Sequence, residues 1–233
     1  MKEIEVVEKL LSDAVENSDA ETQYALGYCY KGGITVKYNP DEAIKCFRKA
    51  AEKGNIDAQI NLGMCYLYGD CVEFDQKKGL YWLKKAADQG ESEALYKMGL
   101  YFTDDIPDYF EDDSVHDKAR RTRRKGIKYC QQAAEKGNAA AQEFMGICYL
   151  NGTLVPKNDE EAARWFSKSA ENDCPYSQYI LGNMYCEGTG VDKDESKATY
   201  WLKQAAKNGN EEAKEKLKEM RREFFDKLIL KPR

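Results

Sequence analysis

The sequence predicts an all-α fold, a solenoid of five tandem helix-pair repeats with a capping helix at each end. The first observation behind this prediction is a glycine that recurs at steps of 36, 36, 47 and 36 residues: Gly27, Gly63, Gly99, Gly146 and Gly182. The second is a pair of small residues that keeps the same steps: Ala50-Ala51, Ala86-Ala87, Ala133-Ala134, Ser169-Ala170 and Ala205-Ala206. Two motifs that move together, even through the long step, indicate repeats of one supersecondary unit.

The first helix of each repeat, helix A, surrounds the recurring glycine. Small residues stand five positions before the glycine, and Leu or Met stands one position before it. An aromatic residue stands three positions after it: Tyr30, Tyr66, Phe102, Tyr149 and Tyr185. These offsets share one face of a helix with 3.6 residues per turn, so they predict a packed face.

The second helix, helix B, contains the small pair and has clear signals at both ends. Its predicted N-caps accept hydrogen bonds from the first free amides: Asn39, Asp75, Thr122, Asn158 and Asp194. Glycine, which tolerates the left-handed conformation that ends helices, follows four of the five helices: Gly54, Gly90, Gly137 and Gly209. Asp173 is the exception in the fourth repeat.

These signals divide the chain into a half repeat, five repeats and a cap. Residues 1–18 are the N-terminal helix, and residues 210–233 form a Lys- and Glu-rich capping helix and tail. The five repeats follow in this order: 19–54, 55–90, 91–137, 138–173 and 174–209. The third is longer by 11 residues, which places an insertion at about 104–121. One helix pair cannot bury its apolar face alone, so neighbouring repeats must stack.

Composition limits the classes of partner. Of 233 residues, 42% are hydrophobic, which is too many for a disordered chain, and the net charge is -5. An acidic chain does not favour nucleic acid, because phosphate binding needs clustered cations. No apolar run is long enough to span a membrane, and charges interrupt the first eleven residues where a secretory signal would be apolar. We therefore expect a cytoplasmic protein, no membrane insertion, no nucleic-acid partner and a monomer.

The cysteines and the histidine favour packing over chemistry. Cys29, Cys65 and Cys148 share a helix A column, and Cys46 and Cys130 lie in core columns of helix B. Stacked helices lie about 8–10 Å apart, which is too far for disulfides within a column. Buried free thiols are therefore expected there. The remaining three have no shared column: Cys71, Cys174 and Cys186.

No catalytic, cofactor or metal site is predicted. There is no Cys-x-x-Cys pair for zinc, and no Gly-rich phosphate loop, because the glycines recur at repeat spacing. His116 is the one histidine of the chain and lies in the acidic insertion, where a solvated side chain is the expected state.

The columns resemble the Sel-1-like repeat family, relatives of the tetratricopeptide repeats. The fifth repeat shows this with Gly182-x-x-Tyr185-x-x-Gly188-x-Gly190-Val191-x-x-Asp194-x-x-x-Ala198-x-x-Trp201-x-x-x-Ala205-Ala206-x-x-Gly209, and the likeness covers about 19–209. The resemblance implies a right-handed superhelix and a role in assembling proteins into complexes. A cysteine-rich branch of the family has a regular cysteine pair in each repeat, with reported penicillin-binding and hydrolase activity, but no such pair recurs here.

Helix A has a second apolar side, which predicts a concave groove for a peptide or helix. Its residues lie three positions before the glycine or one position after it, with two polar interruptions: Tyr24, Tyr28, Ile60, Met64, Tyr96, Leu100, Glu143, Tyr179 and Asn183. Tyrosine suits protein recognition because a large ring is buried while its hydroxyl stays hydrogen-bonded. Core packing between adjacent A helices is the alternative interpretation.

The insertion is the most distinctive segment of a single repeat. Seven acids within 104–117 precede six bases within 118–125. One interpretation is a solvated loop followed by a helix B extended by a turn or more. The other is a docking element, with these residues in contact: Tyr109, Phe110, Arg120, Arg121 and Arg124.

The sequence therefore predicts a non-enzymatic scaffold or adaptor that binds a protein or peptide, without a cofactor. One alternative is a dedicated inhibitor or immunity-type binder of a single protein. A second is a hydrolase like those of the cysteine-rich branch. RNA binding through Arg120–Arg124 is a weaker alternative, because the chain as a whole is acidic.

Overall fold

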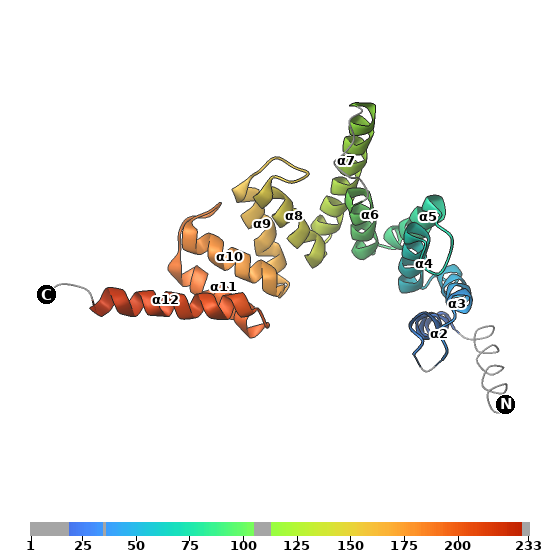
Figure 1. Cartoon of the computed structure of the whole chain (residues 1–233), viewed down its shortest axis with the longest axis horizontal. Helices are drawn as coiled ribbons and strands as arrows, with labels where there is room; N and C mark the ends of the chain where they lie inside the picture. The colour runs from blue at the N-terminus through green and yellow to red at the C-terminus, as the bar shows by residue number, and fades with distance from the viewer. Residues whose placement is uncertain (1–18, 35, 105–112, 230–233) are drawn as a thin grey trace. The chain divides into compact units, whose positions relative to one another are not determined.

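The fold is all-α, as the repeat columns predicted. The computed structural model describes residues 19–34, 36–104 and 113–229, and these residues form eleven helices and no strand (Figure 1). The helix predicted over residues 3–18 and the insertion residues 105–112 lie outside the described residues. The chain divides after Asp104 into two compact units, unit 1 and unit 2, which are treated separately below.

The described residues of unit 1 form five helices of 13 residues each. They are α2 (Ala20–Gly32), α3 (Pro40–Glu52), α4 (Ile56–Tyr68), α5 (Gln76–Asp88) and α6 (Ser92–Asp104). Each helix packs on the next one along the chain, so helices A and B alternate. A buried cluster that includes Phe47, Leu62 and Tyr66 joins α3 to α4.

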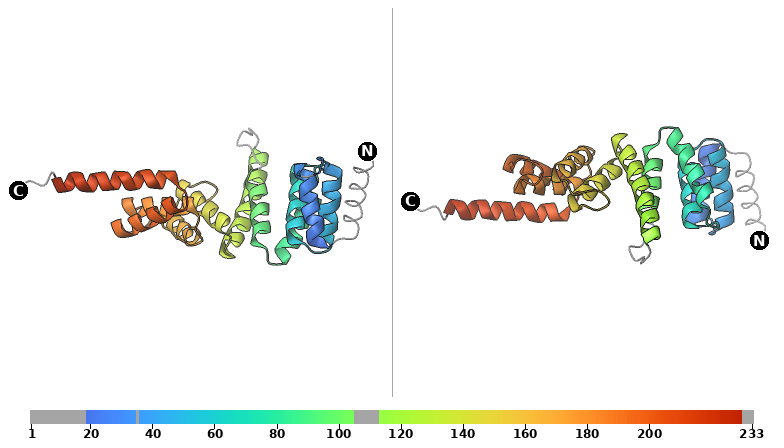
Figure 2. Two further views of the ribbon diagram at one scale, coloured as in Figure 1. Left: turned by 90° about the horizontal axis from the view of Figure 1, so that it is seen from below. Right: turned by 90° about the horizontal axis from the view of Figure 1, so that it is seen from above.

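Unit 2 continues the alternation through six helices. They are α7 (Asp113–Glu135), α8 (Ala139–Asn151), α9 (Asp159–Glu171), α10 (Pro175–Glu187), α11 (Glu195–Lys207) and α12 (Glu211–Ile229). Phe166, Leu181 and Met184 are buried together between α9 and α10. Figure 2 shows that the C-terminal part of α12 extends past the α10–α11 pair.

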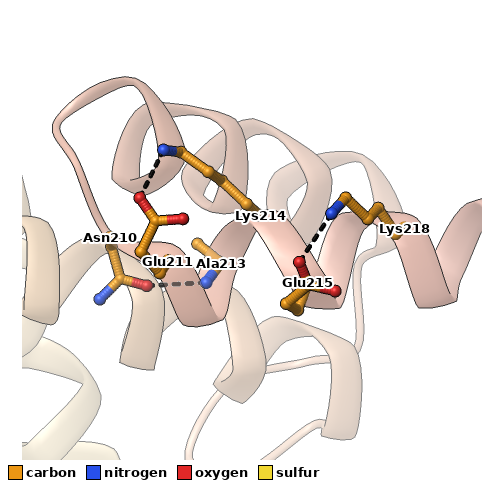
Figure 3. A network of polar contacts seen from close by, with 6 residues as sticks. All are labelled: Asn210, Glu211, Ala213, Lys214, Glu215 and Lys218. Atoms are coloured by element: carbon orange, nitrogen blue, oxygen red, sulfur yellow. Dashed lines mark hydrogen bonds and ion pairs between the residues drawn. The ribbon is translucent and has the colours of Figure 1, made fainter.

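Helix α12 covers the last helix pair with one face and presents charge on the other. Ala213 is buried against Leu202, and Leu217 packs against the same cluster. On the other face, Lys214 pairs with Glu211 at 2.6 Å and Lys218 pairs with Glu215 at 2.7 Å (Figure 3). Such pairs contribute little stability, but they keep the outer face of a terminal helix solvated.

The predicted N-caps of helix B are confirmed at four of the five positions. In each of the four, the side chain accepts a hydrogen bond from a backbone N–H two or three residues later: Asn39, Asp75, Asn158 and Asp194. The prediction for Thr122 is wrong, because Thr122 lies inside α7, which has 23 residues. The segment from Asp113 to Arg121 contains no Gly or Pro, so nothing local stops the helix from starting earlier.

The ends of helix B share one backbone conformation even where the residue differs. Gly54, Gly90, Gly137 and Gly209 all have φ values between 92° and 97°. Asp173, the predicted exception, also has a positive φ of 59°. Asp is among the few other residues that adopt this region readily, so the turn is kept without glycine.

The recurring glycine of helix A lies where helix B approaches most closely. A Cβ built on Gly182 would lie 2.7 Å from Cγ of Leu202, and one on Gly27 would lie 2.7 Å from the ring of Phe47. Gly63 faces Leu83 in the same way, at 2.8 Å. The glycine column therefore marks the contact between the two helices of a pair.

A ladder of buried glutamines, which the sequence analysis did not predict, links successive helices. Gln178 Nε2 donates a hydrogen bond to the Ala170 carbonyl at 3.1 Å, and Asn208 Nδ2 donates to Gln178 Oε1 at 3.0 Å. The same two bonds recur around Gln59 and around Gln142. Each of these glutamines therefore joins the helix before it, its own helix and the helix after it.

Candidate protein-binding surface

The predicted groove residues of unit 1 lie on α2, α4 and α6. We call five of them, Tyr24, Tyr28, Met64, Tyr96 and Leu100, the A-face of unit 1. Tyr28 is 54% exposed, and the other four are partly buried. Ile60, predicted for the same groove, is only 9% exposed and belongs to the core. The A-face therefore presents one exposed ring among four half-exposed side chains.

Tyr24 is held in place between two A helices. Asn61 Nδ2 on α4 donates a hydrogen bond to the Tyr24 hydroxyl at 3.3 Å, and the Tyr24 ring lies 5.9 Å from the ring of Phe47. Burial raises the pKa of the Tyr24 hydroxyl, and the nearby carboxylate of Asp57 adds to this effect. The Tyr28 ring lies 6.5 Å from that of Tyr24, so the exposed ring rests on a fixed one.

In unit 2 the corresponding positions are used differently. Tyr179 is partly buried and packs against the cluster of Leu202 and Ala213. Asn183 is partly buried on α10. Glu143 Oε2 accepts a hydrogen bond from the buried Ser177 hydroxyl at 2.9 Å. This carboxylate is therefore engaged within the fold.

Glu143 is one of three neighbouring residues that depart from the repeat columns, together with Ser169 and Ser177. Ser177 Oγ also lies 2.8 Å from Ser169 Oγ, and the Ser169 hydroxyl donates to the Ala139 carbonyl at 3.0 Å. Ser169 and Ser177 stand where most of the other repeats have alanine, and Glu143 stands where the others have Tyr or Ile. The three polar side chains satisfy one another, which is what burial of a hydroxyl requires.

The predicted docking residues of the insertion are only partly within the described structure. Tyr109 and Phe110 lie outside the described residues, and Arg120 lies on α7 with a side chain that is not described. Arg121 and Arg124 are exposed on α7. The structure therefore places at least two exposed cations on α7.

Four exposed apolar side chains, which the sequence analysis missed, gather at the A–B turns of unit 1. Ile34, Tyr38, Tyr68 and Phe74 are 51% to 60% exposed. The two turns touch, since Lys31 Nζ lies 2.7 Å from Asp70 Oδ2 and Tyr38 OH lies 4.0 Å from Cys71 Sγ. A sequence signal exists, because the residue before the N-cap is aromatic at Tyr38 and Phe74 but lysine in the last two repeats: Lys157 and Lys193.

The cysteines predicted to pack in the core do so in four of five cases. Cys46, Cys65, Cys130 and Cys148 are buried, and Cys29 is partly buried. All eight cysteines lie in the described residues and are free thiols. Burial raises the pKa of Cys46, Cys65 and Cys148 to about 11. A thiol with such a pKa is a poor nucleophile, because the thiolate is the reactive form.

This pKa predicts slow alkylation. A pKa raised from 9.0 to about 11 lowers the thiolate fraction at pH 8 by roughly a hundred-fold. Iodoacetamide should therefore leave Cys46, Cys65 and Cys148 unmodified in the native protein and modify them after denaturation, as peptide mass spectrometry can measure. Rapid native labelling of Cys65 would contradict the burial described here.

Two other kinds of feature are absent from the described residues. No helix there is both long and apolar enough to cross a membrane. Within the same residues, no three His, Cys, Asp or Glu side chains come together in a way that could hold a metal ion.

Comparisons with known proteins agree with the repeat geometry. The Sel1 repeat family model matches residues 20–55, 56–91, 120–138, 139–174 and 175–210. The third match covers only the helix B side of its repeat, on the C-terminal side of the insertion. No curated protein matches the chain.

Several solved structures share the fold. The crystal structure of a Sel1 repeat protein from Oxalobacter formigenes is 35% identical with a TM-score of 0.64, covering 84% of this chain and 75% of that chain. Immunity protein Pa5087 from Pseudomonas aeruginosa is 19% identical with a TM-score of 0.54, covering 87% of this chain and 74% of that one.

A second immunity protein, PA5088 from the same organism, is 20% identical with a TM-score of 0.51, covering 84% of this chain and 68% of that one. At these identities the two immunity proteins show a likeness of fold alone. The five matched segments together cover well over half of the residues, and the Oxalobacter protein is similar over most of both chains. The chain therefore belongs to the Sel1 repeat family.

Proposed function

We propose that the chain is a non-enzymatic scaffold that binds a polypeptide on the A-face of unit 1. The observation that carries this proposal is the exposed ring of Tyr28, which rests on Tyr24, on a series of A helices that also carries the partly buried side chains of Met64 and Leu100. Large aromatic side chains are enriched among the residues that dominate protein binding.

The support under this surface favours binding. Tyr24 is tied to Asn61 on the neighbouring A helix, so little side-chain freedom is lost when a partner covers it. Met64 is a flexible, polarisable side chain that adapts to irregular partner surfaces. The A-face thus combines an aromatic side chain held by a hydrogen bond, Tyr24, with a flexible side chain, Met64.

Three buried cysteines are poor candidates for a catalytic nucleophile, which the hydrolase alternative needs. Burial raises the pKa of Cys46, Cys65 and Cys148 to about 11. A nitrocefin and esterase screen on purified protein tests this part of the proposal. Turnover that survives further purification would contradict it.

The number of partners distinguishes an adaptor from a dedicated inhibitor. An adaptor binds several proteins, whereas a dedicated inhibitor binds one protein tightly in a fixed ratio. The two Pseudomonas immunity proteins share the fold, which supports keeping the second role as the alternative. Stoichiometry of the captured complex by light scattering separates the two.

A matched pair of tyrosine variants tests the A-face. Tyr28 on α2 and Tyr81 on α5 are 54% and 52% exposed, both in unit 1, so Tyr28→Ser and Tyr81→Ser remove similar exposed area from different helices. Tyr28→Ser should lose the proteins that the wild-type chain captures from its native lysate, as quantitative mass spectrometry measures, while Tyr81→Ser retains them. Equal capture by all three chains would refute binding through the A-face.

A further inference from the structure

The solvent face of α7 carries a stripe of cations. Arg121, Arg124, Lys125 and Lys128 are exposed, and their spacing of three, four and seven residues places them on one side of the helix. Buried residues lie on the opposite side: Gly126, Ile127, Cys130, Ala133 and Ala134. At 1.5 Å per residue the stripe is about 10 Å long. We call these four cations the basic face of α7.

Within the described structure, neighbouring carboxylates do not pair with Arg121, Arg124 or Lys128. The sequence from Lys118 to Ala134 contains no acidic residue, and Asp117 and Glu135 stand directly before and after it. Among the residues that the structure describes, Arg121, Arg124 and Lys128 form no ion pair, and Lys125 Nζ lies 5.9 Å from the centroid of the Tyr129 ring. Glu143 on α8, the helix that packs against α7, is bonded to Ser177.

Two other B helices, α3 and α9, differ from α7. On α3 the exposed positions along one side carry both signs, with acids at Asp41 and Glu52 and bases at Lys45 and Arg48. Lys45 also pairs with Glu42, and on α9 Arg164 pairs with Glu161 at 3.3 Å. Opposite charges three or four residues apart stabilise a helix in this way. The basic face of α7 departs from the pattern of α3 and α9.

We propose that the basic face of α7 binds an acidic segment of a protein partner. The proposal rests on the protein-binding role proposed above, and it adds a surface in unit 2 that is separate from the A-face of unit 1. The positive charge of the face favours carboxylate ligands. Each of the two arginines has a planar guanidinium group that can form two parallel hydrogen bonds to one carboxylate. A stripe two helical turns long matches carboxylates spaced three or four residues apart on a partner helix.

Nucleic acid fits these observations less well. Its binding grows with the number of phosphates neutralised along an extended path, and the described stripe offers four cations over two turns. The rest of the chain is acidic, with 41 acids against 36 bases overall, so it repels a long polyanion. A short acidic segment of protein meets only the stripe.

Fluorescence anisotropy with a defined probe tests the proposal. The probe is a labelled helical peptide with glutamate at every third or fourth position, and its glutamine counterpart and a single strand of DNA of similar length serve as comparisons. The full chain should bind the glutamate peptide, bind the glutamine peptide at least about five-fold more weakly, and bind DNA no better than the glutamate peptide. Added salt should weaken the glutamate complex.

Two double variants with the same spacing locate the site. Arg124→Gln with Lys128→Gln removes two cations of the basic face, and Lys203→Gln with Lys207→Gln removes two exposed cations of α11 in the same unit. The first pair should weaken the peptide complex about five-fold, and the second should leave it nearly unchanged. Arg124→Glu with Lys128→Glu should instead favour the lysine version of the peptide, which a merely unfolded variant would not do.

Three results would overturn the proposal: equal affinity for the glutamate and glutamine peptides, equal weakening by the two Gln double variants, or tighter binding of DNA. Tyr28→Ser should bind the glutamate peptide as the wild-type chain does. Failure at α7 therefore leaves the proposed role of the A-face untouched, and failure at Tyr28 leaves the basic face of α7 untouched.

Discussion

Gly190→Ala should lower the free energy of unfolding by about 3 kcal/mol. Gly190 has a φ of 67°, a left-handed conformation that costs an alanine about 1–2 kcal/mol. A Cβ there would also overlap the Asp159 carbonyl oxygen at the start of α9. Backbone cannot move aside as a flexible side chain can, so a further cost of about 1–3 kcal/mol is expected. Urea denaturation followed by circular dichroism measures the loss.

Gly209→Ala is the matched control for this loss. Gly209 has a φ of 94° in the same unit, but a Cβ there would meet nothing within 4 Å. Only the conformational cost remains, so the expected loss is about 1–2 kcal/mol. The difference between the two variants isolates the close approach of Gly190 to α9. Equal losses would show that this approach does not limit the residue at position 190.

Phe166→Ala should cost about 3–5 kcal/mol, the range for removing a buried aromatic side chain. Phe166 is fully buried in the cluster with Leu181 and Met184, and its ring lies 3.0 Å from where a Cβ of Gly146 would stand. The cavity would therefore lie between α8, α9 and α10. Thermal and urea unfolding give the total loss, and amide hydrogen exchange shows where it falls.

Tyr176→Ala supplies the comparison for Phe166→Ala. Tyr176 is 44% exposed in the first turn of α10, so its removal should change stability by no more than about 0.5 kcal/mol. Exchange in Phe166→Ala should accelerate in α8, α9 and α10 more than in α2, α3 and α4, because each repeat contacts only its neighbours. Uniform acceleration along the chain would contradict such local coupling.

The features that were predicted correctly are those set by local spacing. An N-cap such as Asn158 acts on a backbone amide three residues away, and the glycine at Gly182 is required by one facing helix. Both are readable because the same demand recurs in each repeat. Thr122 failed because a cap residue permits a helix to start without forcing it to, and the preceding residues continue α7 instead.

The candidate site was harder to predict, because one helix A column serves two purposes. Ile60 is core, whereas Tyr24 in the same column is partly exposed. The difference depends on which side chains the neighbouring helices supply, and spacing within one helix does not report that. The buried glutamines were missed for a related reason: a search for apolar columns passes over a polar side chain whose partners lie 8 residues before and 30 residues after it.

The spacing of the glutamine ladder would be kept if one whole repeat were removed or inserted. The Gln142 side chain donates a hydrogen bond to the Ala134 carbonyl, and the Gln178 side chain donates to the Ala170 carbonyl. Each acceptor therefore lies 8 residues before its donor. Excising residues 139–174, one matched Sel1 segment, would bring Ala134 to that same distance from Gln178. The excision removes both partners of the hydrogen bond from Asn172 to the Gln142 side-chain oxygen, so neither amide is left without its partner. Recombination between repeats can therefore lengthen or shorten such chains while the glutamine hydrogen bonds at each junction are kept.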